Sequence, residues 1–197
     1  MATRRPVDFV TALRSPTDHV RSHYNYLIEI FERGPEFYDQ HGPAAKAISE
    51  RIRSADNTDP RDVIAQLDAA AELFLNFQSS YALGCRDVLT DDELAHRLGV
   101  YRAIGHGEHI GAFVEWLTGI PAEDVGRENS SVAHVPPEVF EDPDLQDFLA
   151  ERNAADVALY TFVEQHVTLP AERLPLADDQ NSRFSRILAA LPLRSRR

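Results

Sequence analysis

Residues 7–33 constrain the fold most, because they read as a buried strand, a tight turn and an amphipathic helix. Val7 to Leu13 is a short apolar run with β-branched and aromatic members, which is typical of a buried strand. Ser15-Pro16-Thr17 then supplies a capping hydroxyl and a proline for a helix that we expect over Thr17 to Arg33. This order predicts an α/β fold, with the first strand central in a small parallel sheet and the helix packed on it.

The expected helix has an apolar side and a polar side. Four apolar residues recur at helical spacing and predict the buried stripe: Val20, Tyr24, Leu27 and Phe31. At about 100° per residue, a second set falls on roughly the opposite side: Ser15, Asp18, Ser22 and Tyr26. Ser22 therefore need not belong to the core.

Arg14 stands at the carboxyl end of the expected strand, directly before the helix. In an open α/β sheet this edge is where ligands bind, and the start of a helix presents unpaired N–H groups to an anion. A guanidinium can bond two phosphate oxygens at once, so Arg14 and Ser22 together could clamp a phosphate. The alternative is that Arg14 makes a surface ion pair and Ser22 is solvated.

The same segment resembles the 3′-phosphate-binding element of sulfotransferases that use 3′-phosphoadenosine 5′-phosphosulfate (PAPS). In that family an Arg at the end of a strand precedes a Ser on the next helix, typically as L-R-D-P-x-x-R-x-x-S-x-Y. Here the matching residues are Leu13, Arg14, Pro16, Ser22 and Tyr24, whereas Ser15 replaces the acidic residue and the second Arg is displaced to Arg21. The resemblance implies that Arg14 and Ser22 bind the 3′-phosphate of PAPS or its product PAP.

Three later stretches resemble the membrane-associated and bacterial carbohydrate-type branch of that family. Asn76-Phe77-Gln78, continuing to Leu83-Gly84, resembles an N-x-Q…L-x-G element. The run from Ile104 to Glu108 resembles an I-G-x-x-E turn, and Asp156 to Tyr160 resembles a D-x-x-L-Y helix. The resemblance covers Phe9 to about Val167 and implies a P-loop-type sulfotransferase fold that is truncated at its N-terminus.

A fifth stretch lies in the connector that we expect over Ile120 to Pro143. Arg127-Glu128-Asn129-Ser130 resembles a later nucleotide-contacting or substrate-side segment of the family. The resemblance implies that Arg127 approaches the 3′-phosphate, so Arg127 joins Arg14 and Ser22 as a candidate cofactor-binding residue.

The phosphosulfate-binding loop of the family has no counterpart in this sequence. In the family, a Gly-rich turn with a Lys and a Ser or Thr holds the 5′-phosphosulfate. The only lysine of this chain is Lys46, in a helix-forming context without glycines. The stretch that carries the loop and, in many members, the catalytic base would precede Met1, so the catalytic residues stay unknown.

Three classes of function are therefore open. The first is a PAPS-dependent sulfotransferase, which moves a sulfuryl group to a hydroxyl or amine of a small molecule or sugar, inactive in the chain as given. The second is a non-catalytic nucleotide-binding or protein-interaction module derived from that fold. A third is a helical metal-binding protein using His106, Glu108 and His109, although a carboxylate in the first turn of a helix explains Glu108 more simply.

Composition limits the kinds of partner and the cellular location that we expect for this protein. The formal net charge of −12 disfavours nucleic acid and anionic membranes as partners, because phosphate contacts need a basic field. The single cysteine, Cys85, allows no intramolecular disulfide. Without an apolar leader or a bilayer-spanning stretch, a cytoplasmic location is expected. The sheet edge left by the missing first strand invites pairing, so a homodimer is also expected.

The remaining chain reads as mainly helical. Helices are expected over Pro43 to Ser54, Pro60 to Leu83, Gly107 to Thr118 and Leu145 to Val167, with a capping box at Thr90 to Glu93 and a second strand over Val100 to Ile104. We expect one sulfotransferase-like domain over residues 1–169 and a basic tail over 170–197.

Overall fold

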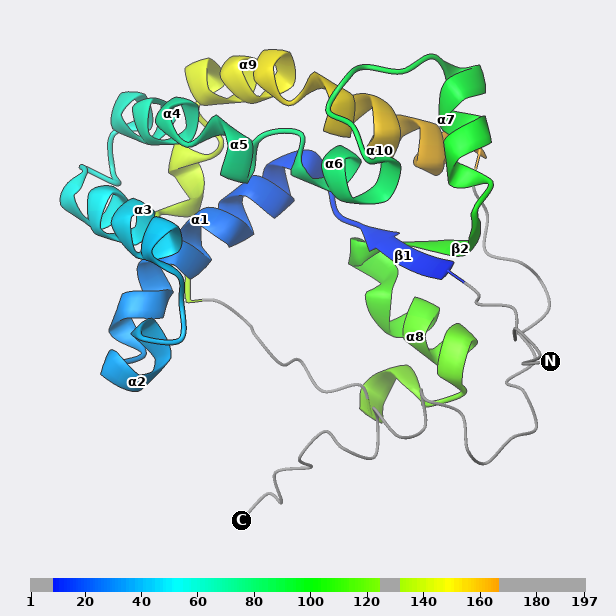
Figure 1. The fold of residues 1–197 in the computed structure, drawn as a ribbon, viewed down its shortest axis with the longest axis horizontal. Coiled ribbons are helices and arrows are strands. Elements are labelled where there is room, and N and C mark those ends of the chain that lie inside the picture. The colour runs from blue at the N-terminus through cyan, green and yellow to red at the C-terminus, as the bar shows by residue number, and fades with distance from the viewer. Residues whose placement is uncertain (1–8, 125–131, 167–197) are drawn as a thin grey trace, which may run out of the picture.

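A computed structural model of the chain describes residues 9–124 and 132–166. These residues form a small parallel sheet surrounded mainly by helices (Figure 1). The sheet consists of β1 (Phe9–Leu13) and β2 (Tyr101–His106). The expected α/β class with a small parallel sheet is thus confirmed. The two first residues of the expected strand, Val7 and Asp8, and the basic tail lie outside the described residues.

Helices occupy most of the remaining described chain. The α-helices are α1 (Pro16–Glu32), α2 (Pro35–Tyr38), α3 (Pro43–Ser54), α4 (Pro60–Ala69), α5 (Ala71–Phe74), α6 (Phe77–Leu83), α7 (Asp91–Leu98), α8 (Ile110–Thr118), α9 (Pro143–Arg152) and α10 (Ala154–His166). Short 3₁₀ turns are η1 (Gly107–His109), η2 (Ala122–Asp124) and η3 (Pro137–Val139).

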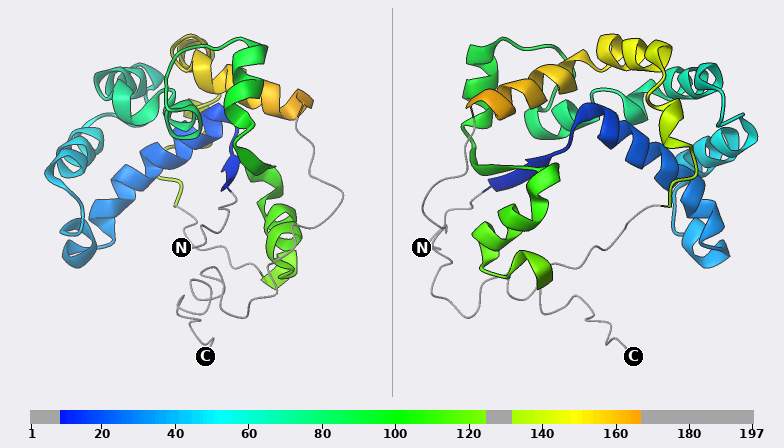
Figure 2. Two further views of the ribbon diagram at one scale, coloured as in Figure 1. Left: turned by 45° about the vertical axis from the view of Figure 1, so that its right-hand side comes forward. Right: turned by 180° about the vertical axis from the view of Figure 1, so that it is seen from behind.

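The two strands pair in parallel, and their carboxyl ends are level because Leu13 is the register partner of His106. Helices α6, α7 and α10 lie on one side of the sheet and α8 lies on the other (Figures 1 and 2). Leu13 and Ile104 join a buried cluster with residues of α6, α7 and α10. Among the described residues β1 has one strand neighbour, so the expectation of a central strand is wrong there.

Helix α1 confirms the expected helix within one residue at each end. The Ser15 hydroxyl accepts a hydrogen bond from the Asp18 N–H at 3.4 Å, and Pro16 occupies the first turn. Val20, Tyr24 and Leu27 are buried in the larger core cluster, which α1 shares with α3, α4, α5 and α9. Phe31 is the exception, because it is 43% exposed and packs instead beneath the Arg53 guanidinium.

Two long expected helices are each broken in the structure. The stretch from Pro60 to Leu83 forms three helices, and the stretch from Leu145 to Val167 forms two that meet at Asn153. Asn76 adopts the left-handed conformation with φ of 53°, which Asn tolerates better than most residues, and it ends the run before α6 begins. Propensity alone favoured continuous helices, and tertiary hydrogen bonds at these asparagines override it.

The breaks allow the starts of α6 and α10 to cap each other. Asn76 Oδ1 accepts from the N–H groups of Ala155 at 2.9 Å and Asp156 at 3.3 Å, in the first turn of α10. The Asp156 carboxylate in turn accepts from the N–H groups of Gln78 at 3.1 Å and Ser79 at 2.7 Å, in the first turn of α6. Each helix start therefore satisfies the unpaired donors of the other.

Other local expectations hold. The capping box at Thr90 and Glu93 is complete in both directions and begins α7. The expected second strand is β2, which extends two residues beyond Ile104. The helix expected over Gly107 to Thr118 divides into η1 and α8. No helix in the described ranges is both long enough and apolar enough to cross a bilayer.

Candidate functional site

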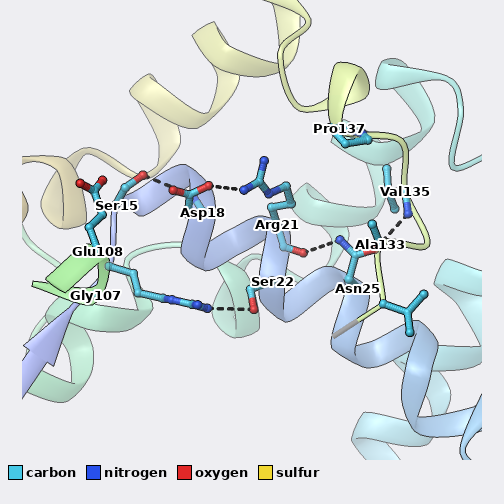
Figure 3. A pocket seen from close by; sticks show the side chains of 12 residues that line it. Ser15, Asp18, Arg21, Ser22, Asn25, Gly107, Glu108, Ala133, Val135 and Pro137 are labelled. Atoms are coloured by element: carbon cyan, nitrogen blue, oxygen red, sulfur yellow. Dashed lines mark hydrogen bonds and ion pairs between the residues drawn. The ribbon is translucent and has the colours of Figure 1, made fainter. Parts of the chain in front are cut away.

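A pocket of about 480 Å³ opens where the two strands end and α1 begins (Figure 3). Its walls come from the polar side of α1, from the Gly107–Glu108 turn that follows β2, and from the segment before η3. The residues that line it are Arg14, Ser15, Asp18, Arg21, Ser22, Asn25, Gly107, Glu108, Val132, Ala133, Val135 and Pro137. The carboxyl edge of the sheet, where ligands bind in open α/β folds, is thus hollow.

Arg14 and Ser22 are in direct contact in this pocket. Arg14 Nη1 donates a hydrogen bond of 3.0 Å to Ser22 Oγ. Within residues 9–124 and 132–166, no carboxylate lies within ion-pair distance of the Arg14 guanidinium. The alternative of a surface ion pair at Arg14 thus finds no support in the described chain. A guanidinium with a neutral hydroxyl as its partner retains charge and donors for an anion.

The Arg14 backbone is fixed by Gln78 of α6. Gln78 Oε1 accepts from Arg14 N at 2.8 Å, and Gln78 Nε2 donates to Arg14 O at 2.9 Å. A side-chain amide that bonds both backbone groups of one residue takes the place of a neighbouring strand at that residue. Gln78 is buried, and its own N–H is bonded to Asp156. The junction between β1 and α1 is therefore tied to the start of α10.

These contacts bring together the segments that carry the family resemblance. The N-x-Q element supplies Asn76 and Gln78, and the D-x-x-L-Y element supplies Asp156. The I-G-x-x-E turn adjoins Arg14, because it continues the strand that pairs with β1. Asp156, only 1% exposed, makes the contacts expected of a residue that closes the core and satisfies a buried turn.

The pocket holds two cationic and two anionic side chains. Arg21 Nη2 lies 2.6 Å from Asp18 Oδ1 and forms an ion pair with it (Figure 3). Glu108, on the turn after β2, also lines the pocket (Figure 3). Because Asp18 already pairs with Arg21, Arg14 is the better placed of the two arginines to meet an incoming anion.

Asn25 attaches the far wall of the pocket to α1. Its Oδ1 accepts from the N–H groups of His134 at 2.7 Å and Val135 at 2.9 Å, while its Nδ2 donates to Arg21 O at 2.9 Å. The side chain is 4% exposed and uses its oxygen and its amide nitrogen. The segment before η3 is thus held against the helix that carries Ser22.

Gly105, near the end of β2, occupies a position that leaves no space for a side chain. A Cβ on Gly105 would lie 2.5 Å from Cγ of Phe113, so only glycine lets α8 approach β2 this closely. The neighbouring His106 ring packs edge-on against Tyr160 at 5.7 Å between centroids. In the ranges that the structure describes, no three His, Cys, Asp or Glu side chains gather as a metal site.

Two histidines of α1 lie beside the site, packed on aromatic rings of α5 and α6. His19 stacks on Phe77 with 5.5 Å between centroids, and His23 lies 5.3 Å from Phe74. Each Nδ1 is buried and lacks a hydrogen-bond partner among the described residues. Burial lowers the pKa of His19 and lowers the pKa of His23 to about 4.

Because the pKa values of these two histidines are lowered, we expect the folded protein to lose stability in mild acid. An unfolded histidine titrates near a pKa of about 6.5, so between that pH and about 4 the unfolded chain binds protons that folded His23 does not. The free energy of unfolding should therefore decrease as the pH is lowered through this window. His23 contributes up to about 1.4 kcal/mol per pH unit to this decrease. Urea denaturation at pH 7 and pH 5 measures this.

The matched variants are His23→Gln and His96→Gln. His23→Gln should flatten the pH dependence of the unfolding free energy, because Gln does not titrate. His96→Gln, at an exposed position of α7, controls for the replacement of a histidine by glutamine as such. Equal slopes in all three proteins would contradict the assignment to His23.

The structure does not place every candidate residue. Arg14 and Ser22 meet, whereas Arg127 lies outside the described residues, and its approach to the phosphate stays a prediction. Sequence reasoning did not anticipate the clamp by Gln78 or the ion pair of Arg21 with Asp18. The i,i+3 spacing of Asp18 and Arg21 was the available signal for that pair.

Comparison with known proteins gives no assignment. No protein-family model matches the chain, and no curated protein or solved structure matches it.

Proposed function

We propose that this chain is a protein of the PAPS-dependent sulfotransferase family, of the carbohydrate and bacterial type, that binds the 3′-phosphate of the nucleotide between Arg14 and Ser22. The observation that carries the proposal is the Arg14–Ser22 hydrogen bond in a pocket at the carboxyl end of a parallel strand. The expected ligands are PAPS or PAP, together with a small-molecule or sugar acceptor.

The chemistry of the pocket supports a phosphate ligand. The Arg14 guanidinium offers up to five N–H donors, and Ser22 offers a hydroxyl that can turn from acceptor to donor. Hydrogen bonds from a cation to a phosphate are short and strong, and a guanidinium can make two in parallel. The two hydrogen bonds from Gln78 fix the Arg14 backbone, which reduces the conformational entropy lost when an anion binds.

The alternative is a non-catalytic nucleotide-binding or interaction module with the same pocket. The sequence favours this alternative, because it has no Gly-rich turn with a lysine. Its only lysine, Lys46, pairs instead with Asp39, with 2.8 Å between Nζ and Oδ1.

We also propose pairing of two copies along β1, because Phe9 is 57% exposed and β1 has one strand neighbour in the described chain.

Isothermal titration calorimetry with adenosine 3′,5′-bisphosphate tests the nucleotide proposal. Binding should be weak but measurable, because one phosphate meets a built clamp while the other has none assigned to it. A folded protein that gives no heat with millimolar nucleotide would remove the proposal. Circular dichroism of the same sample establishes that the protein is folded.

The chain as given should transfer sulfuryl groups only at the background rate. As the S–O bond breaks, negative charge develops on the 5′-phosphate, and the loop that stabilises it in the family has no counterpart in the sequence. Losing one preorganised donor for such charge costs on the order of a hundredfold in rate. An assay with labelled PAPS and a panel of phenols, amines and sugars measures this. Turnover that depends on Arg14 would contradict it.

A further inference from the structure

Gly107 is the residue on which the Arg14 side chain rests. The strand register brings them together, because Leu13 pairs with His106 and the residues that directly follow the two strands are Arg14 and Gly107. Gly107 occupies one of the unspecified positions of the I-G-x-x-E element, so the family resemblance gives it no role. It belongs to the wall of the pocket, half-buried in the first position of η1.

The space above Gly107 is filled by Arg14 itself. A Cβ at position 107 would lie 2.7 Å from Arg14 Cγ and 3.3 Å from both Arg14 Cα and Leu13 O. Contacts below 3.0 Å between carbons are repulsive, so one group has to move. The Arg14 backbone is held by its two hydrogen bonds to Gln78. The Arg14 side chain is therefore the group that yields.

Movement of Cγ redirects the whole Arg14 side chain. Cγ precedes Cδ and the guanidinium, and a staggered change at the first side-chain torsion displaces the charged end by several times as much. The 3.0 Å bond to Ser22 Oγ depends on the present rotamer. Without that bond, the two halves of the phosphate clamp would no longer face the same point.

We infer that Gly107 is a positioning residue for the anion site: by having no side chain, it lets Arg14 lie across the turn and reach Ser22. This inference rests on the proposed function, since it concerns recognition of the 3′-phosphate. Gly107 acts through Arg14. Selection for a phosphate at the 3′ position is the property it controls.

Calorimetric titrations of Gly107→Ala with two nucleotides test the inference. Adenosine 3′,5′-bisphosphate carries the phosphate that Arg14 would bind, and adenosine 5′-monophosphate lacks it. Gly107→Ala should weaken binding of the bisphosphate about tenfold, the size expected for one charged hydrogen bond, and should leave binding of the monophosphate unchanged. In an Arg14→Ala background, the same change should have no further effect, because the two residues act together.

Gly42→Ala is the matched control. Gly42 lies before α3 with φ of −67°, and a Cβ there would meet nothing within 4 Å. This variant should bind both nucleotides as the wild type does.

The outcomes separate this inference from the proposed function. If Arg14→Ala weakens bisphosphate binding and Gly107→Ala does not, the positioning role is wrong and the nucleotide site stands. Equal weakening of both nucleotides by Gly107→Ala would indicate general damage and would also overturn the role. Failure of Gly107→Ala to fold would overturn it too, because the backbone rather than Arg14 would then bear the clash. If Arg14→Ala has no effect, the proposed function itself fails.

Discussion

Asp156→Ala should lower the free energy of unfolding by roughly 3–5 kcal/mol, because it leaves buried donors without partners. The carboxylate accepts from three donors at the start of α6: Gln78 N at 3.1 Å, Ser79 N at 2.7 Å and Ser79 Oγ at 2.6 Å. It is 1% exposed, so water does not replace these bonds in the folded protein. Urea denaturation followed by circular dichroism measures the change.

Asp68→Ala is the control for the loss of an acidic residue. Asp68 pairs with Arg152 at 2.7 Å, but both side chains are about half exposed, at 55% and 49%. Exposed ion pairs contribute about 0–1 kcal/mol, so this variant should be nearly as stable as the wild type. Asp156→Asn keeps the shape of the side chain and one acceptor oxygen. Its free energy of unfolding should lie between those of Asp156→Ala and Asp68→Ala. A loss below about 1 kcal/mol for Asp156→Ala would contradict the capping role.

Arg14→Ala should weaken binding of adenosine 3′,5′-bisphosphate by at least about tenfold, since each hydrogen bond to a charged group is worth roughly 1.5–3 kcal/mol. Ser22→Ala should cost less, because a neutral hydroxyl contributes one weaker bond. Arg14→Lys should fall between the wild type and Arg14→Ala, because an ammonium keeps the charge and loses the planar fork. Isothermal titration calorimetry measures all three affinities.

Arg61→Ala is the matched loss of positive charge away from the pocket. Arg61 is exposed at the start of α4, and its removal should leave nucleotide affinity unchanged. If Arg61→Ala and Arg14→Ala weaken binding equally, the effect comes from overall charge, and the site assignment is wrong.

The strand, turn and helix at the start of the described chain could be predicted because local chemistry determines them. The apolar run ending at Leu13, the capping hydroxyl of Ser15 and the proline after it all favour the same structure, and β1 and α1 follow. Val20, Tyr24 and Leu27 were recognisable as core for the same reason, since a stripe at helical spacing has one buried side. The same stripe wrongly included Phe31, whose ring is exposed and lies beneath the guanidinium of Arg53 from another helix.

The breaks at Asn76 and Asn153 could not be predicted, because their partners are distant in the sequence. Asn76 ends one helix and caps another whose first turn lies about eighty residues later. Ala-rich and Leu-rich flanks favour continuous helices, and only the tertiary hydrogen bonds make the interruption favourable. An Asn within an apolar helical pattern was the available signal.

The candidate site was predictable in part. The strand–turn–helix order and the family resemblance grouped Arg14 and Ser22 at one expected phosphate site, and the structure places the two side chains in contact. The pocket wall from the turn after β2 depends on parallel pairing with a register that no local pattern specifies. The roles of Gln78 and Gly107 follow only from that assembly.

Recognition of the phosphate position is the central claim, and a comparison of two isomers tests it most directly. Adenosine 3′,5′-bisphosphate and adenosine 2′,5′-bisphosphate have the same charge and composition, so overall electrostatic attraction does not distinguish them. The wild-type protein should bind the 3′ isomer about tenfold more tightly, and Arg14→Ala should lose that preference. Equal affinity of the wild type for both isomers, or binding of neither, would contradict a 3′-phosphate site at Arg14 and Ser22.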